Sequence, residues 1–114
     1  MSKVDAVREA SKRAGCTVLL KGPATVIASP DGTASIHAAL YDRTAPWLAT
    51  AGAGDVLAGI ITGLLANDMA SFYIHQIVEV ATYLHVESAR SFGPGLIAED
   101  LPEELPKVFS ALGL

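Results

Sequence analysis

The sequence predicts a single α/β domain in which a few strands are followed only by helices. The chain has 114 residues, which is enough for one domain and too few for two ordinary ones. Its residues are 51% hydrophobic but only 6% aromatic, so aliphatic side chains and alanine must build the core, as in helices packed on a sheet. The spacing of the apolar residues is helical at first, then strand-like, then helical again.

The first predicted elements are a helix and a buried strand. Residues 3–14 have the apolar stripe of an amphipathic helix, which Ser2 can cap and Gly15 can end. The run Cys16–Leu20 is almost continuously apolar, which is typical of a strand buried on both faces, and Cys16 is expected to be a small buried hydrophobe. This order of helix, turn and strand predicts half of a βαβ unit.

A hairpin is predicted next. The segments Ala24–Ser29 and Ala34–Ala39 are both predicted strands. Between them, Pro30 fixes its own φ, Asp31 can bond its own backbone and Gly32 tolerates a positive φ, so this segment is a turn.

The rest of the chain predicts helices. A loop over Ala49–Gly54 leads into a helix from Asp55 to about Ala66, which has a wide apolar face. A longer helix spans about Ser71–Ser91 and ends before Gly93-Pro94-Gly95. Pro102 can take the first position of a last short helix that ends near Leu112.

Composition excludes several classes of protein. A formal charge of −4, from 8 Lys and Arg against 12 Asp and Glu, argues against a nucleic-acid surface. One cysteine excludes an internal disulfide and a multi-cysteine zinc site. The longest apolar stretch, Val56–Ala66, is shorter than the roughly 20 residues of a membrane span, and the N-terminus lacks the apolar core of a signal peptide. We therefore expect a cytoplasmic protein that binds neither membranes nor nucleic acid.

The most informative segment is the glycine-rich loop that feeds directly into a helix. Small residues at Gly52, Ala53 and Gly54 let a ligand approach the backbone closely. The first N–H groups of the helix are unpaired and carry roughly +0.5 charge, which favours phosphate. Asp55 could be a general base or simply an acidic residue that stabilises the first turn, and spacing alone leaves both open. The loop is neither a Walker P-loop nor a Gly-x-Gly-x-x-Gly fingerprint.

The segment Ala51-Gly52-Ala53-Gly54-Asp55-Val56-Leu57-Ala58-Gly59-Ile60 resembles the signature of the ADP-dependent NAD(P)H-hydrate dehydratase family, part of the ribokinase-like superfamily. Leu19–Ala28 is similar to the second nucleotide-contacting segment of that family, and Tyr83-Leu84-His85 and Gly93–Pro102 to its closing helices. The resemblance covers nearly the whole chain. It implies a ribokinase-like three-layer α/β/α architecture, of which this chain would be the C-terminal part.

The resemblance also implies a repair reaction. The substrate would be hydrated NADH or NADPH, whose hydroxyl is phosphorylated by ADP or ATP with Mg²⁺ and then eliminated. Asp55 would contact the substrate and remove the hydroxyl proton, and the amides of Gly52, Ala53 and Gly54 would hold the phosphoryl group. The nucleotide site would be lined by Lys21, Gly22, Pro23, Ala24 and Thr25, with Lys21 either a point charge near phosphate or an anchor at the end of a strand. No dedicated ligand cage for the metal is visible, and a homo-oligomer is expected.

Two departures keep alternatives open. The family often has glycine where this chain has Ala51, so the loop is also close to the wider sugar-kinase pattern. Family domains are more than twice as long, and their His-Pro-Gly-Glu-like substrate segment has no counterpart here. The alternatives are a small-molecule hydroxyl kinase, acting on a sugar or vitamin precursor, and a non-catalytic nucleotide-binding or assembly module.

Other polar and aromatic residues predict structural roles. His75 and Glu79 lie one helical turn apart, but no third ligand follows at helical spacing, so no metal is expected there. His85 is expected to be a packed or capping histidine. Trp47 is expected to pack in the core or at its rim rather than stack on a base.

Overall fold

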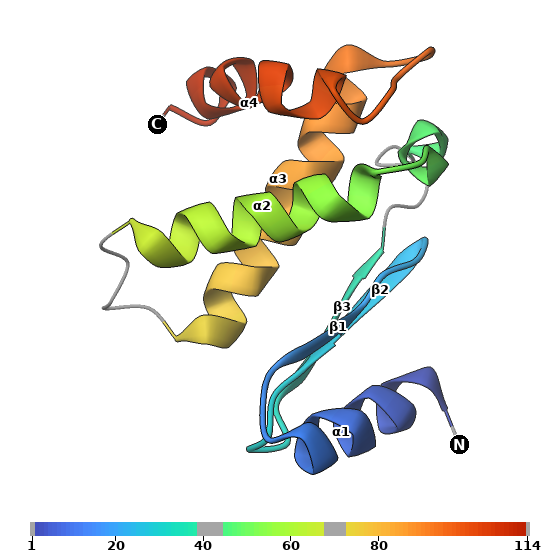
Figure 1. The fold of residues 1–114 in the computed structure, drawn as a ribbon, viewed down its shortest axis with the longest axis vertical. Coiled ribbons are helices and arrows are strands. Elements are labelled where there is room, and N and C mark those ends of the chain that lie inside the picture. Colours follow the sequence, from blue (N-terminus) through green and yellow to red (C-terminus); the bar gives the residue numbers. More distant parts are fainter. Residues whose placement is uncertain (1, 39–44, 68–72, 114) are drawn as a thin grey trace.

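The computed structural model describes residues 2–38, 45–67 and 73–113. A helix, three strands, a short 3₁₀ helix and three further helices follow one another along the chain (Figure 1). Their bounds are α1 Lys3–Ala14, β1 Val18–Leu20, β2 Ala24–Ala28, β3 Ala34–Ala38, η2 Pro46–Ala49, α2 Ala53–Ala66, α3 Ile74–Phe92 and α4 Asp100–Ala111. The predicted α/β class and the order of its elements are confirmed.

The three strands form an antiparallel sheet in the order β1-β2-β3. The predicted hairpin is confirmed: Val26 pairs with Ile36, and Asp31 accepts a 2.8 Å hydrogen bond from the Thr33 amide in the turn. The predicted half of a βαβ unit, a helix followed by a strand, is present as α1 and β1, and β1 runs antiparallel to β2. Only residues 21–23 separate these strands, and such a short connection cannot cross over a sheet to make a parallel pair.

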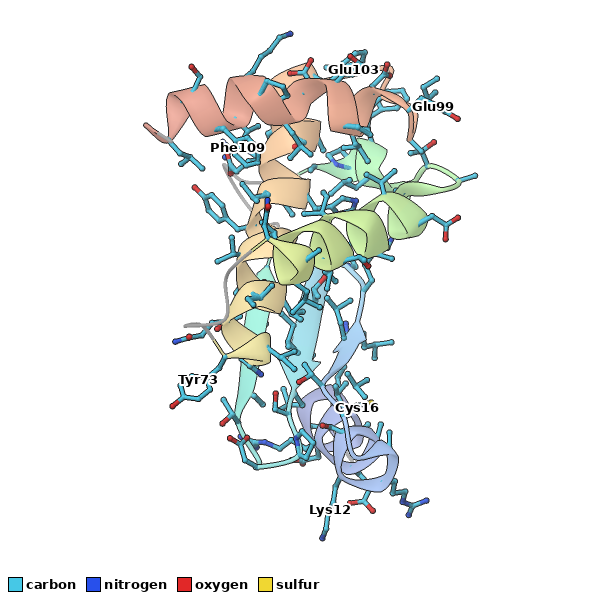
Figure 2. The ribbon with its side chains drawn as sticks, turned by 60° about the vertical axis from the view of Figure 1, so that its left-hand side comes forward. Lys12, Cys16, Tyr73, Glu99, Glu103 and Phe109 are labelled. Atoms are coloured by element: carbon cyan, nitrogen blue, oxygen red, sulfur yellow. The ribbon has the colours of Figure 1, made fainter. Side chains whose placement is uncertain are left out.

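The strand predicted to be buried on both faces is also corrected. Cys16 precedes β1 and is exposed, near the end of α1 in Figure 2. Leu20 is 46% exposed. Within the described residues β1 pairs with β2 alone, so it is an edge strand there. The central strand β2 is the buried one instead, with Val26, Ile27 and Ala28 almost inaccessible.

Helices cover both faces of β2, which gives the predicted three layers. Val26 and Ala28 pack with Val7 of α1 on one face. Thr25 and Ile27 alternate with them and therefore point to the other face, where α3 contacts the strand. A second core, between α2, α3 and α4, contains Ala53, Ala89, Leu96 and Leu101.

Helices α2, α3 and α4 differ from their expected bounds by one to three residues. Helix α2 begins at Ala53 rather than Asp55, and Asn67 follows its end. Helix α3 begins at Ile74, and residues 71 and 72 lie outside the described part. Helix α4 begins at Asp100, whose carboxylate accepts a 3.0 Å hydrogen bond from the Ile97 amide, so the helix starts before Pro102.

Helix α2 is strongly apolar but buries little of its surface. Ala53 and Leu57 are its buried residues, whereas Leu65 is 45% exposed. A methyl group at Gly59 or Gly63 would meet no atom within 4 Å. One side of α2 is therefore uncovered by the rest of the described chain. None of the described helices is both long and apolar enough to span a membrane.

Two glycines of this region predict opposite effects on stability. Gly52 has φ +88°, and a Cβ there would lie 3.2 Å from the Cβ of Ala98. Gly52→Ala should therefore lower the free energy of unfolding by about 1–2 kcal/mol.

Gly59 is helical with open space around it. Gly59→Ala should therefore raise the free energy of unfolding by about 0.5–1 kcal/mol. Urea unfolding checks both, and a Gly52→Ala variant as stable as the parent would contradict the account.

Candidate functional site

The first turn of α2 leaves two backbone amides without a carbonyl partner among the described residues. The positive φ of Gly52 turns the chain so that the helix starts at the next residue. The amides of Asp55 and Val56 both donate to the Gly52 carbonyl, at 3.1 and 3.2 Å, and the Ala53 amide donates to Thr50 at 3.3 Å. Within the described residues, the amides of Gly52 and Gly54 donate to no carbonyl. These two donors lie at the positive end of the helix dipole.

A lysine lies against this helix end. Lys21 follows β1 directly, and its ammonium nitrogen would lie 3.7 Å from a Cβ placed on Gly54. A cation is unfavourable beside the positive end of a helix. An anion bound between them would be stabilised by both, as at the helix N-termini that bind phosphate. The structure thus brings together the two segments that the sequence marked as separate phosphate-binding candidates.

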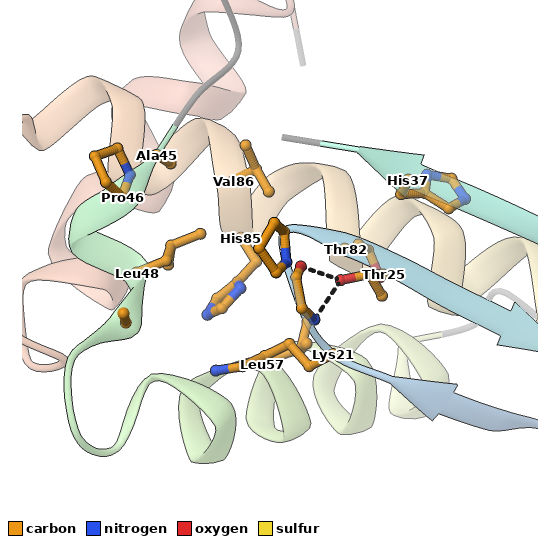
Figure 3. Close-up of a pocket in the computed structure, with 13 residues that line it drawn as sticks. Lys21, Thr25, His37, Ala45, Pro46, Leu48, Leu57, Thr82, His85 and Val86 are labelled. Atoms are coloured by element: carbon orange, nitrogen blue, oxygen red, sulfur yellow. Dashed lines mark hydrogen bonds between the residues drawn. The ribbon is translucent and has the colours of Figure 1, made fainter. Parts of the chain in front are cut away.

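The loop that carries Lys21 is held from both sides. The Thr25 hydroxyl accepts from the Gly22 amide at 3.3 Å and donates to the Gly22 carbonyl at 3.1 Å (Figure 3). Lys3, at the start of α1, donates from its ammonium group to the Ala24 carbonyl. The loop between β1 and β2 is therefore fixed by one hydroxyl and one ammonium group.

A mainly apolar cavity of about 360 Å³ opens beside Lys21. Four of the five predicted nucleotide-site residues line it: Lys21, Gly22, Pro23 and Thr25. Ala24 does not line it. The other walls come from β3, from residues 45–49, from α2 and from α3: His37, Ala45, Pro46, Leu48, Ala49, Leu57, Thr82, His85 and Val86. Cavities of this size with few polar groups are typical of small-molecule sites.

His85 connects the cavity to the first turn of α2. Its side chain is buried, and its Nε2 atom lies 2.9 Å from the Ala53 carbonyl oxygen. Burial lowers the pKa of His85; the bond to the Ala53 carbonyl opposes this shift, and the nearby Lys21 ammonium reinforces it. The packed, hydrogen-bonding role expected for His85 is confirmed.

The sequence did not predict that His85 lines the cavity, nor that the other wall residues from β3, residues 45–49 and the helices do. Thr82, His85 and Val86 follow the spacing of one helix face, which is a signal that they share a surface. Nothing in the sequence indicates which surface this face meets, because that depends on how α3 packs against the sheet.

Asp55 is exposed in the first turn of α2, next to Gly54, and does not line the cavity. It therefore faces solvent at the same end of α2 that Lys21 lies against.

Trp47 is 50% exposed and lies against Arg90 and Pro94 in a different, shallower hollow. Its position is that of a rim residue.

The candidate metal ligands, His75 and Glu79, have protein partners. The two ring nitrogens of His75 lie 2.7 Å from the Ser29 hydroxyl and 3.0 Å from the Ser35 hydroxyl. Glu79 lies 3.2 Å from the Nε2 atom of His37. Among residues 2–38, 45–67 and 73–113, no three His, Cys, Asp or Glu side chains cluster in a way that could hold a metal ion.

Comparisons with known proteins add independent findings. Residues 1–108 match the family model described as NAD(P)H-hydrate dehydratase. A bifunctional NAD(P)H-hydrate repair enzyme of Methanopyrus kandleri is 38% identical over 105 residues, which make up 91% of this chain and 20% of that protein. An ADP-dependent (S)-NAD(P)H-hydrate dehydratase of Cenarchaeum symbiosum is 37% identical over 103 residues, or 90% of this chain and 34% of that protein.

Solved structures are similar as well. An ADP/ATP-dependent NAD(P)H-hydrate dehydratase of Bacillus subtilis, co-crystallised with ATP and Mg²⁺, superposes with a TM-score of 0.81 and 29% sequence identity. The match covers 96% of this chain and 39% of that one. The chain thus spans between a fifth and two fifths of the length of these proteins.

Proposed function

Because the chain belongs to the NAD(P)H-hydrate dehydratase family, we propose that it supplies the nucleotide-binding part of an enzyme that repairs hydrated NADH and NADPH. The observation that carries this proposal is the position of the Lys21 ammonium over the first turn of α2, at the edge of an apolar cavity. A cation and free amides suit phosphates, and apolar walls suit a base and sugar.

The nucleotide would bind with its phosphates between Lys21 and the amides of Gly52 and Gly54. The Ala53 amide would join them only by exchanging its 3.3 Å bond to Thr50. The base and ribose would lie in the cavity between Pro46, Leu48 and Val86. In the free protein, the Lys21 ammonium group is repelled by the positive end of the helix. Phosphates bound between them would offset this repulsion.

Mg²⁺ would arrive with the nucleotide rather than bind on its own. No cluster of three ligating side chains exists in the described part of the chain. Magnesium keeps several waters and is commonly held by substrate phosphates with one or two carboxylates, so this site fits a phosphate-bound ion. Bound there, it would neutralise the charge on the transferred phosphoryl group.

Asp55 would act as the base of the reaction. Its carboxylate would accept the proton of the substrate hydroxyl as that oxygen attacks the terminal phosphorus of ADP or ATP. The amides at the first turn of α2 would stabilise the charge on the transferred group, and such fixed donors are usually the largest catalytic contribution. Loss of the phosphate with a proton from the neighbouring carbon would then restore the double bond of the ring.

The residues that bind the hydrated nicotinamide ring would come largely from parts of the domain that this chain does not contain. The relatives are several times longer than the matched region. The uncovered apolar surface of α2 around Leu65 would pack against those parts. We further propose that the enzyme works in the cytoplasm as a homo-oligomer, without binding nucleic acid or membranes.

The test is recovery of the absorbance of reduced nicotinamide from hydrated NADH by the protein that carries this chain. Mg·ADP, Mg·ATP and no nucleotide are compared. Nucleotide-dependent recovery is expected. A stable phosphorylated product without recovery would instead support a kinase, and nucleotide-independent recovery would contradict the proposed role of Lys21 and the α2 amides.

A further inference from the structure

The hydrogen bond of His85 fixes which ring nitrogen carries the proton. A carbonyl oxygen can only accept, so Nε2, at 2.9 Å from the Ala53 oxygen, must be the protonated nitrogen. In the neutral ring, Nδ1 is then an acceptor with a free lone pair.

The Nδ1 atom has no hydrogen-bond partner among the described residues. Among the described residues, the Ser88 hydroxyl is the one side-chain polar atom that is both fully inaccessible and without a partner. Since Nδ1 of His85 also lacks a partner, it must be accessible, although the residue as a whole is only 3% exposed. The ring lines the cavity, and Figure 3 shows it on the same side as Lys21, near the start of α2. The accessible Nδ1 atom therefore belongs to a ring that lines the cavity near Lys21, whose charge acts on it and which is proposed to hold the phosphates.

Among the described residues, Lys21, which follows β1, is the group whose charge acts on this ring. Strand β2 and helix η2 contain no ionisable residue. On the other elements around the cavity, Asp55 of α2 is exposed to solvent and His37 of β3 is bonded to Glu79. Burial and the Lys21 charge both lower the pKa of His85 against the opposing bond to the Ala53 carbonyl, which favours the neutral ring in the free protein.

We propose that His85 is a phosphate ligand that takes up one proton from solvent when nucleotide binds, so that Nδ1–H then donates to a phosphate oxygen. The inference rests on the proposed nucleotide site. Without a proton, the Nδ1 lone pair would face the lone pairs of the phosphate and repel them. A bound phosphate also offsets the Lys21 charge, which removes one of the two reasons for the neutral ring.

Calorimetric titration with Mg·ADP near pH 7, in buffers of different ionisation enthalpy, measures the protons taken up. His85→Gln is the test variant, because the glutamine amide can still donate to the Ala53 carbonyl. His75→Gln is the control, because His75 is also buried but lies outside the cavity, between Ser29 and Ser35. Terminal phosphates also titrate near pH 6, so the difference between variants is the informative quantity.

We expect the parent and His75→Gln to take up more protons than His85→Gln, by a sizeable fraction of one proton for each ADP bound. Equal uptake in all three would overturn the inference and leave the nucleotide site intact. Absence of any binding to the parent chain would overturn the proposed site as well. If His85→Gln does not fold, the NMR signals of the His85 ring nitrogens in the parent report its protonation state directly. A neutral ring in the ADP complex would then refute proton uptake.

Discussion

Replacing Lys21 by alanine should weaken the binding of Mg·ADP by about tenfold to a hundredfold. The ammonium group lies at the first turn of α2, where it would form charge-assisted hydrogen bonds to phosphate oxygens. Such bonds contribute about 1.5–3 kcal/mol each, and 1.4 kcal/mol corresponds to a factor of ten in affinity. The fold should not suffer, because the side chain is exposed and lies beside the positive end of a helix.

Calorimetric titration of the parent, Lys21→Ala and Lys12→Ala with Mg·ADP tests this prediction. Lys12 is the matched control, because it is exposed on α1, at the end of the molecule opposite α4 (Figure 2). Its removal changes the net charge equally, so a general charge effect would weaken both variants alike. Equal affinity in the parent and in Lys21→Ala would exclude Lys21 from the phosphate site.

Replacing Asp55 by asparagine should lower turnover of hydrated NADH by about a hundredfold to ten-thousandfold and leave Mg·ADP affinity within a few fold. Asparagine has the same shape but cannot accept a proton at this position, and general-base catalysis contributes factors of this size. The residue is exposed, so stability should fall by no more than about 1 kcal/mol, the contribution of a carboxylate near the positive end of a helix.

The measurement is the nucleotide-dependent recovery of reduced-nicotinamide absorbance, made with the protein that carries this chain. Glu103→Gln is the control, because Glu103 is an exposed carboxylate in the first turn of another helix, α4. If Asp55→Asn turned over at the parent rate, the residue would be only an acid that stabilises the first turn of α2.

Local chemistry in the sequence indicated only part of the candidate site. The glycine-rich loop indicated the amides of Gly52 and Gly54, whereas Lys21 was indicated by the family resemblance of Leu19–Ala28. Their approach to one another depends on how α2 packs beside the sheet, and the packing of α3 brings His85 to the same place. No local pattern contains that information.

The error about the burial of β1 has the same origin. An apolar run at Cys16–Leu20 is equally compatible with an edge strand and with a central one, and only the pairing of β1 with a single neighbour separates the two. The hairpin was predictable because its direction is set by the turn around Asp31. The turn at residues 21–23 carried similar information, since a connection of three residues requires antiparallel strands.

The central claim is that a nucleotide binds where Lys21, the α2 amides and His85 meet. Titration of the ¹⁵N-labelled chain with Mg·ADP tests it most directly, because amide signals report which residues the ligand approaches. We expect the largest shifts at Gly22, Gly54 and Leu57, with α1 unchanged beyond its first turn. Shifts centred instead on the apolar groove between α2 and α4, around Gly63 and Phe109, or no shifts at all, would contradict the claim.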